Sequence, residues 1–166
     1  MSSTSSRIRL GRLAAGLTVA AAATASALLG ATPAYAATTV TAAMDGSRVL
    51  IIGTDFSDSI TASGSGSTVN LSNLLGSISA GNGCTQLGAT VRCTGATSVK
   101  FVGMPGNDTF QNNTALPSSL FGGLGSDRLT GGPAADRISG GSDADFAFGQ
   151  GGLDSCTAEN ESGCEV

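Results

Sequence analysis

The stretch that decides the fold runs from Gly122 to Thr157 and reads GGLGSDRLTGGPAADRISGGSDADFAFGQGGLDSCT. It divides into four units of nine residues, and each unit opens with Gly. The sixth position of each unit is an aspartate, namely Asp127, Asp136, Asp145 and Asp154. The eighth position holds an apolar or small residue, namely Leu129, Ile138, Ala147 and Cys156. The Gly- and Ser-rich composition resembles that of a flexible linker. The fixed nine-residue period instead predicts a repeated structural unit.

The same unit recurs upstream in a less regular form. Residues 103–111, GMPGNDTFQ, place Asp108 sixth, and residues 53–61, GTDFSDSIT, place Asp58 sixth. Residues 112–121, NNTALPSSLF, form an irregular unit of ten residues without the Asp. The runs between the Gly clusters are short and rich in β-branched and apolar residues, and none downstream of the N-terminal region shows a helical period. We therefore expect an all-β fold.

The spacing within a unit has a physical meaning. Six Gly-rich residues allow a tight turn because Gly tolerates positive φ, and the last three form a short strand whose middle side chain faces inward. Two units then complete one coil, so turns on the same side lie eighteen residues apart. Ser118, eighteen residues before Asp136, brings no carboxylate. This register places Asp108, Asp127 and Asp145 along one edge, and Asp136 and Asp154 along the other.

Stacked carboxylates at the spacing of neighbouring strands repel one another unless a cation lies between them. Calcium suits such a gap, because it takes roughly six to eight oxygen ligands. An Asp from each of two turns, together with backbone carbonyls, supplies ligands of this type. On this interpretation Asp127 contributes to two sites and Asp154 to one. The alternative is that each Asp only caps its own turn, but capping does not require a nine-residue period.

The pattern resembles the G-G-x-G-x-D-x-U-x nonapeptide of RTX, or haemolysin-type, calcium-binding proteins. The resemblance implies a right-handed parallel β-roll, a β-solenoid whose Gly- and Asp-rich turns bind Ca²⁺. Three residues depart from the Gly positions of this pattern: Ala134 and Asp143 at the fourth place and Gln150 at the second. The residues that the resemblance assigns to the metal are Asp108, Asp127, Asp136, Asp145, Asp154, Gly123, Gly125, Gly132 and Gly141.

The N-terminal 36 residues have the features of a secretory signal peptide. Arg7, Arg9 and Arg12 precede a short Ala-rich apolar run, and ATPAYA ends in small residues. We expect cleavage between Ala36 and Ala37, and hence a secreted, extracellular protein without a membrane span. An uncleaved membrane anchor is the alternative. The expected organisation is a signal peptide at 1–36, an N-terminal β-solenoid-like segment at 37–102, RTX-type repeats at 103–157 and a disulfide-closed tail at 158–166.

The four cysteines, Cys84, Cys93, Cys156 and Cys164, allow three pairings. An even number in an exported protein indicates disulfides. We favour Cys84–Cys93 and Cys156–Cys164, because each pair closes a short loop that contains Gly and polar residues. A zinc site is disfavoured by the spacing and by the absence of His.

Net charge and amino-acid composition disfavour several classes of function. After removal of residues 1–36, five basic residues remain against twelve acidic ones, a net charge of −7, which disfavours nucleic acid as a partner. Without His, no Ser-His or Cys-His nucleophile can form, so we expect a non-catalytic protein that binds calcium ions. An adhesive or structural surface module is the alternative, with a small extracellular enzyme as a weaker one. The candidate contact surface is the outward row of Thr109, Gln111, Arg128, Thr130, Arg137, Ser139, Phe146 and Phe148.

Overall fold

The computed structural model describes residues 39–165, and these residues form fifteen β-strands in two sheets. The all-β class is therefore confirmed for this part of the chain. The described residues contain no helix, and so none that is long and apolar enough to cross a membrane. The expected signal peptide lies outside the described residues.

The first sheet has seven strands. In spatial order they are β14 (Ser155–Thr157), β12 (Arg137–Ser142), β10 (Ser118–Leu124), β8 (Ser98–Pro105), β2 (Arg48–Ile52), β1 (Thr39–Asp45) and β5 (Ser77–Ala80).

The second sheet has eight strands. In spatial order they are β15 (Asn160–Ser162), β13 (Phe146–Phe148), β11 (Arg128–Thr130), β9 (Thr109–Asn113), β3 (Ser59–Ser63), β4 (Thr68–Asn73), β7 (Thr90–Thr94) and β6 (Cys84–Leu87).

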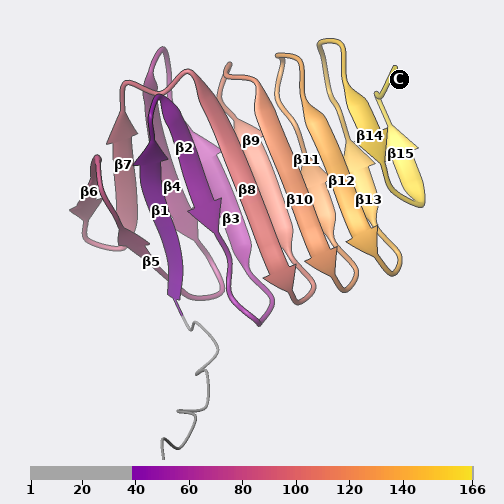
Figure 1. The fold of residues 1–166 in the computed structure, drawn as a ribbon, viewed down its shortest axis with the longest axis horizontal. Coiled ribbons are helices and arrows are strands. Elements are labelled where there is room, and N and C mark those ends of the chain that lie inside the picture. Colours follow the sequence, from indigo (N-terminus) through magenta and orange to yellow (C-terminus); the bar gives the residue numbers. More distant parts are fainter. Residues whose placement is uncertain (1–38, 166) are drawn as a thin grey trace, which may run out of the picture. The chain divides into compact units, whose positions relative to one another are not determined.

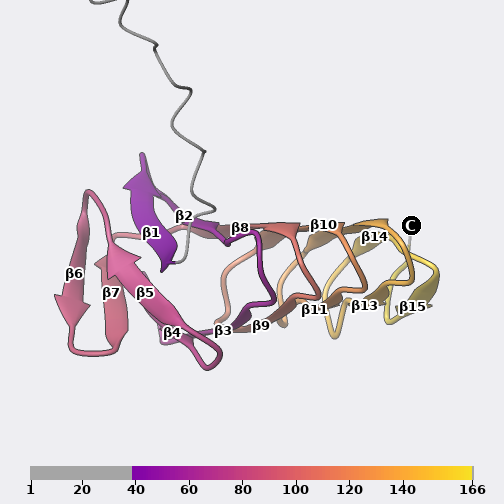
Figure 2. The same ribbon diagram turned by 90° about the horizontal axis from the view of Figure 1, so that it is seen from below.

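From β8 onward the chain alternates between the two sheets, and every strand pairs in parallel with the strand two places later (Figure 1). Leu120 aligns with Ile138 and Leu129 with Ala147, which is the expected eighteen-residue register. Figure 2 shows the sheets edge-on, one above the other. Each nine-residue unit supplies one turn and one strand, so consecutive strands lie in opposite sheets. Strands two units apart therefore lie side by side in the same sheet and run parallel.

The N-terminal part departs from the expected coil. Strand β1 pairs antiparallel with β2, and β4 pairs antiparallel with both β3 and β7. The β6–β7 pair is also antiparallel. A parallel solenoid is therefore not confirmed over this segment, and both sheets are mixed. Two-residue connections explain the antiparallel β1–β2 and β6–β7 pairs, because short turns join antiparallel neighbours; Gly46 in the β1–β2 turn has a φ of 62°.

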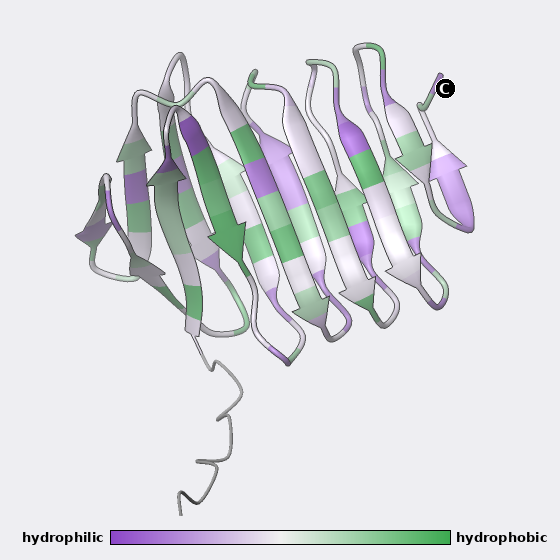
Figure 3. Cartoon of the chain, viewed as in Figure 1, coloured by the Kyte–Doolittle hydropathy of each residue, from purple (hydrophilic) through white to green (hydrophobic). Residues whose placement is uncertain are grey.

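The core lies between the sheets and consists of the inward residues of each strand, as the alternation of apolar and polar positions along the strands shows in Figure 3. Phe101 of the first sheet stacks on Phe110 of the second, with ring centroids 4.6 Å apart. Toward the C-terminus the inward residues shrink from Leu129 and Ile138 to Ala147, which is fully buried. Each coil therefore buries little apolar area, and the polar groups of the turns matter more for stability.

The connections between the sheets form two rows of turns. The first turn row leads from the first sheet to the second and comprises residues 53–58, 103–108, 122–127 and 140–145, along the lower edge of Figure 1. The first three residues of the last three turns are also the final residues of β8, β10 and β12. The second turn row leads back from the second sheet to the first and comprises residues 112–117, 131–136 and 149–154.

Candidate metal centre

A ladder of buried aspartates runs along the first turn row. Each aspartate immediately precedes a strand of the second sheet, and from Asp108 onward its Oδ1 accepts the backbone N–H of the preceding rung. The N–H of Asp58 donates to Asp108 at 2.8 Å, that of Asp108 to Asp127 at 2.7 Å, and that of Asp127 to Asp145 at 2.8 Å. The stack predicted from the eighteen-residue spacing is therefore present.

A shorter ladder runs along the second turn row. Both the N–H and the hydroxyl of Ser118 donate to Oδ1 of Asp136, at 2.6 and 2.7 Å. The N–H of Asp136 donates to Oδ1 of Asp154 at 2.8 Å. Ser118 thus occupies the rung that lacks a carboxylate, as its position in the sequence indicates.

Residues outside the nine-residue period end both ladders. The side chain of Asn73 donates to Oδ1 of Asp58 at 2.9 Å at the start of the first ladder. At the other end, the N–H of Asp145 donates to Glu159 at 2.9 Å, and the N–H of Asp154 donates to Glu165 at 2.7 Å. The two glutamates come from the C-terminal tail, and no period in the sequence identifies them. Their only signal is the presence of carboxylates in a segment next to the last repeat.

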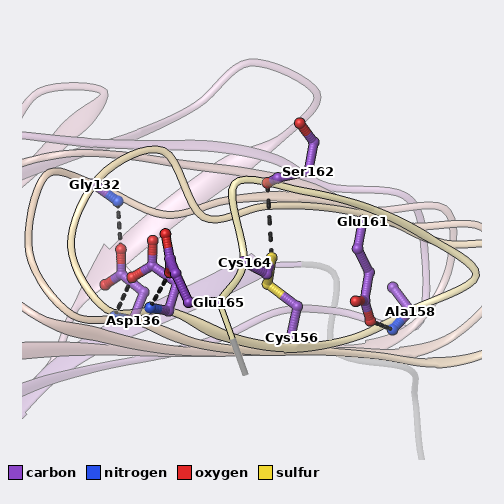
Figure 4. Close-up of a disulfide and its surroundings, with 9 residues drawn as sticks. Gly132, Asp136, Cys156, Ala158, Glu161, Ser162, Cys164 and Glu165 are labelled. Atoms are coloured by element: carbon purple, nitrogen blue, oxygen red, sulfur yellow. Dashed lines mark hydrogen bonds between the residues drawn. A yellow bond between two sulfur atoms is a disulfide. The ribbon is translucent and has the colours of Figure 1, made fainter.

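The second oxygen of each carboxylate divides the aspartates into two groups. In Asp58, Oδ2 accepts the N–H of Thr54 at 2.8 Å, and in Asp136 it accepts the N–H of Gly132 at 2.6 Å (Figure 4). In the other four aspartates Oδ2 is buried and has no hydrogen-bond partner; these are Asp108, Asp127, Asp145 and Asp154. A buried carboxylate oxygen without a partner is costly, because its desolvation is not compensated.

The backbone φ angles divide the turns into the same two groups. In the four turns with an unpartnered Oδ2, the second and the fourth residue both have positive φ, and we call these the open turns. The pairs are Met104 (80°) and Gly106 (138°), Gly123 (131°) and Gly125 (111°), Gly141 (123°) and Asp143 (82°), and Gln150 (78°) and Gly152 (121°). Turns 53–58, 112–117 and 131–136 contain no residue with positive φ, and we call these the closed turns.

The two divisions share one cause. In the closed turns 53–58 and 131–136 the N–H of the second residue points at its own aspartate and satisfies Oδ2. In the open turns the left-handed second residue does not make this hydrogen bond. Met104, Asp143 and Gln150 hold this conformation although they are not glycines, which costs roughly 1–2 kcal/mol each. Such strain persists only where the surroundings enforce it, and it marks candidate functional positions.

The electrostatics agree with this description. Burial raises the pKa of Asp108 to about 7, against the opposing hydrogen bond from the Asp58 N–H, and the neighbouring charges of Asp127 and Asp58 raise it further. Burial likewise raises the pKa of Asp127 to about 6, with Asp145 and Asp143 adding repulsion. The pKa of Asp136 is also raised by burial, but hydrogen bonds from Gly132 and Ser118 oppose the rise. At Asp108 and Asp127 a cation would relieve both the desolvation and the repulsion.

The open turns fit calcium. Their donors are carboxylate and carbonyl oxygens, which a hard cation prefers. A side chain at Gly123, Gly125 or Gly141 would collide with the carbonyl oxygens of Met104, Gly106 and Gly123 respectively, so the turns stack with their backbones in close approach. In residues 39–165 no three acidic or Cys side chains converge on one point. A cation would therefore take most of its ligands from backbone carbonyls and one or two from the aspartates.

Comparison with known families supports this assignment. Residues 121–156 match the family model of the RTX calcium-binding nonapeptide repeat, in four copies. These residues are therefore similar to RTX repeats, and we call them the RTX array. RTX nonapeptide repeats bind Ca²⁺. No curated protein and no solved structure matches the chain.

Most of the predicted metal residues lie in open turns, and only Gly132 and Asp136 lie in a closed turn. The RTX array contains three open turns and the closed turn 131–136, and the open turn 103–108 precedes it. Gly123, Gly125 and Gly141 have positive φ within open turns, whereas Gly132 belongs to the closed turn and donates its N–H to Asp136. The left-handed conformation of Met104 and Gln150 could not be predicted from residue type.

Both predicted disulfides are present, Cys84–Cys93 and Cys156–Cys164, with Cα atoms 4.2 and 5.8 Å apart. Cys84 lies in β6, the outermost strand of the second sheet, and Cys156 lies in β14, the outermost strand of the first. Figure 4 shows the second disulfide beside the hydrogen bond from the Ala158 N–H to Glu161. The disulfides therefore secure the two ends of the stacked strands, and the second one holds the tail that supplies the terminal glutamates.

The outward aromatic pair of β13 is partly exposed. Phe146 is 44% exposed, and the guanidinium of Arg128 lies 4.2 Å from the ring centroid of Phe148. Strand β15 pairs beside β13, with Phe146 opposite Asn160. The tail therefore lies alongside the pair and leaves Phe146 accessible.

Proposed function

We propose that this protein is a secreted, non-catalytic calcium-binding protein whose parallel coils form a β-roll stabilised by Ca²⁺ outside the cell. The observation that carries the proposal is the coincidence, in the same four turns, of paired positive φ values and an unpartnered, buried aspartate oxygen. The RTX array supports calcium as the ion. The positively charged, Ala-rich N-terminal sequence supports export.

We assign the calcium ions to gaps between adjacent open turns. On the first turn row, turns 103–108, 122–127 and 140–145 are adjacent and all open, which creates two such gaps. On the second turn row, the only open turn, 149–154, has the closed turn 131–136 as its neighbour. Two calcium ions are therefore assigned, both on the first turn row, and Asp127 contributes to both.

The export part of the proposal has a thermodynamic basis. Weak extracellular calcium sites bind at about 10⁻⁴ to 10⁻³ M, so they fill outside a cell and stay empty inside it. A chain with small inward residues and buried carboxylates gains little from folding until the ions are present. It can therefore be secreted as an unfolded chain and fold after export. N-terminal sequencing of protein from the culture medium should give Ala37 as the first residue, and protein retained in cells with Met1 intact would exclude this route.

Calcium titration tests the site assignment. Isothermal titration calorimetry of the wild type should give two ions per chain. Asp108→Asn should leave about one, because Asp108 borders a single gap between open turns, and Asp154→Asn should leave two. Binding of no calcium at millimolar concentration would refute the proposal, and loss of an ion in Asp154→Asn would refute the assignment to the first turn row.

A further inference from the structure

A groove runs along the second turn row, on the opposite edge from the proposed calcium sites. Its volume is about 620 Å³, within the range of small-molecule sites. One wall comes from residues 64–66, which connect β3 to β4, and the floor comes from the ends of β9 and β11 with the turns that follow them. Residues 150 and 151 complete the far end.

The lining combines polar and apolar surface and carries no charged side chain. Its exposed groups are the amides of Gln111, Asn113 and Gln150, and the half-buried hydroxyl of Thr130 lies between them along the groove. The remaining polar surface comes from Ser65 and from backbone groups of the Gly-rich turns. This is unusual in a protein with twelve acidic residues, most of which lie in or next to the turns.

The floor of the groove holds its shape without a metal ion. In turn 112–117, Oδ1 of Asn112 accepts the N–H and the hydroxyl of Thr114 at 3.1 and 2.7 Å, and its Nδ2 donates to the carbonyl of Leu116 at 3.0 Å. In turn 131–136, Asp136 is satisfied by Gly132 and Ser118. The two closed turns that form the floor therefore keep their shape through their own hydrogen bonds, which favours binding by a preformed site.

We propose that this groove binds a neutral oligosaccharide. An amide side chain both donates and accepts hydrogen bonds, as does a sugar hydroxyl, so a row of amides matches a chain of vicinal hydroxyls. A charged ligand is disfavoured, because the lining has no basic side chain to neutralise an anion and no carboxylate to neutralise a cation. A peptide would require apolar pockets for anchoring side chains, and the only apolar side chains in the lining are Ala115 and Pro133.

NMR titration of the isotopically labelled full-length protein, with calcium present, tests the proposal. The probes are maltohexaose, cellohexaose, laminarihexaose and chitohexaose, and hexaalanine and tripolyphosphate serve as the peptide and anion probes. We expect at least one hexasaccharide to shift the resonances of Gln111, Asn113, Thr130 and Gln150. The double variant Gln111→Ala/Asn113→Ala should bind about tenfold more weakly, because two hydrogen-bonding side chains are lost.

The control variant is Thr109→Ala, which changes a polar side chain of the same strand, β9, outside the groove. It should bind the saccharide as the wild type does. The proposal is overturned if none of the four hexasaccharides binds, if the double variant binds as tightly as the wild type, or if only the peptide or the anion shifts the groove resonances. Calcium binding is measured separately, so failure of this proposal leaves the calcium assignment intact.

Discussion

Two aspartates at the same position of the repeat should respond in opposite ways to the same substitution. Asp127 lies in an open turn and has an unpartnered, buried Oδ2. Asp136 lies in a closed turn, and both of its oxygens accept hydrogen bonds. Replacement by Asn keeps the shape of the side chain, removes its charge and converts one oxygen into a donor. The pair Asp127→Asn and Asp136→Asn is therefore a matched test of the two kinds of turn.

In the absence of calcium at pH 8, Asp127→Asn should raise the free energy of unfolding. The folded-state pKa of Asp127 is about 6, whereas that of an unfolded Asp is about 3.9. Ionisation therefore opposes folding by up to about 3 kcal/mol above pH 6. The amide removes this term but weakens the hydrogen bond from the Asp108 N–H, so we expect a net gain of about 1–2 kcal/mol.

Asp136→Asn should have the opposite effect, because the hydrogen bonds that it breaks outweigh the relief of the burial that raises the pKa of Asp136. Its amide nitrogen must face either the Gly132 N–H or the donors of Ser118, and a donor opposite a donor leaves a buried group unsatisfied. The expected loss is about 1–3 kcal/mol, with or without calcium.

Calcium should then stabilise the two variants to different extents. At ten times its dissociation constant, each site adds about 1.4 kcal/mol, so two sites stabilise the wild type and Asp136→Asn by about 3 kcal/mol. The free energy of unfolding of Asp127→Asn should rise much less with calcium. Urea unfolding followed by circular dichroism, with chelator and with calcium, measures all six values. The reasoning is refuted if calcium-free Asp127→Asn is destabilised as much as Asp136→Asn, or if calcium stabilises Asp127→Asn as much as the wild type.

Three other perturbations follow from the same structure. In calcium-free protein, the pKa of Asp108 is raised to about 7, so protonation of this side chain contributes stability that is fully present below about pH 4 and is lost as the pH rises through 7. Urea unfolding should therefore show greater stability at pH 5 than at pH 8. With saturating calcium the protein should be more stable at pH 8, because the ligands must be deprotonated. Gly141→Ala should cost about 2–4 kcal/mol, since φ is 123° and the new Cβ meets a carbonyl of the neighbouring coil. Gly46→Ala, at a φ of 62° with open space around it, should cost about 1 kcal/mol, and equal losses in thermal unfolding would contradict the close stacking of the turns. Removing the Cys156–Cys164 disulfide with a double Ser variant should cost about 2–3 kcal/mol by loop closure, and an unchanged melting temperature would exclude a role for this disulfide in holding the tail.

The sequence alone was sufficient for much of the C-terminal half. The nine-residue period located the start of each strand and gave the three-residue length of β11, β13 and β14, because a turn of six Gly-rich residues leaves three for the strand. Strands β10 and β12 are longer than predicted, since each continues to the third residue of the following turn. It also identified the inward side chains, such as Leu129 and Ile138, and the register that stacks Asp127 on Asp145. The disulfide pairs followed from short separations, since cysteines eight or nine residues apart in a Gly-containing loop can meet without long-range folding.

The chemical state of each turn was not predictable in this way. Turns 122–127 and 131–136 both begin with two glycines, yet only the first is open. Turn 140–145 is open although Asp143 replaces the fourth-position Gly. The second oxygen of an aspartate has a hydrogen-bond donor only if the N–H of the second residue in its turn points toward it. The orientation of this N–H depends in part on how the turn stacks against the neighbouring coils.

What the sequence determined about this protein is therefore its period: all-β strands, a buried eighth position, two stacks of aspartates and two local disulfides. The tertiary structure decided which aspartates lack a partner, that Glu159 and Glu165 end the two ladders, and that the N-terminal strands pair antiparallel. It also created the uncharged groove on the second turn row from residues of three coils and of the β3–β4 connection. The physical reason is that a period specifies which residues are equivalent, whereas a hydrogen bond between coils depends on the conformation of both turns and exists only after the coils have stacked.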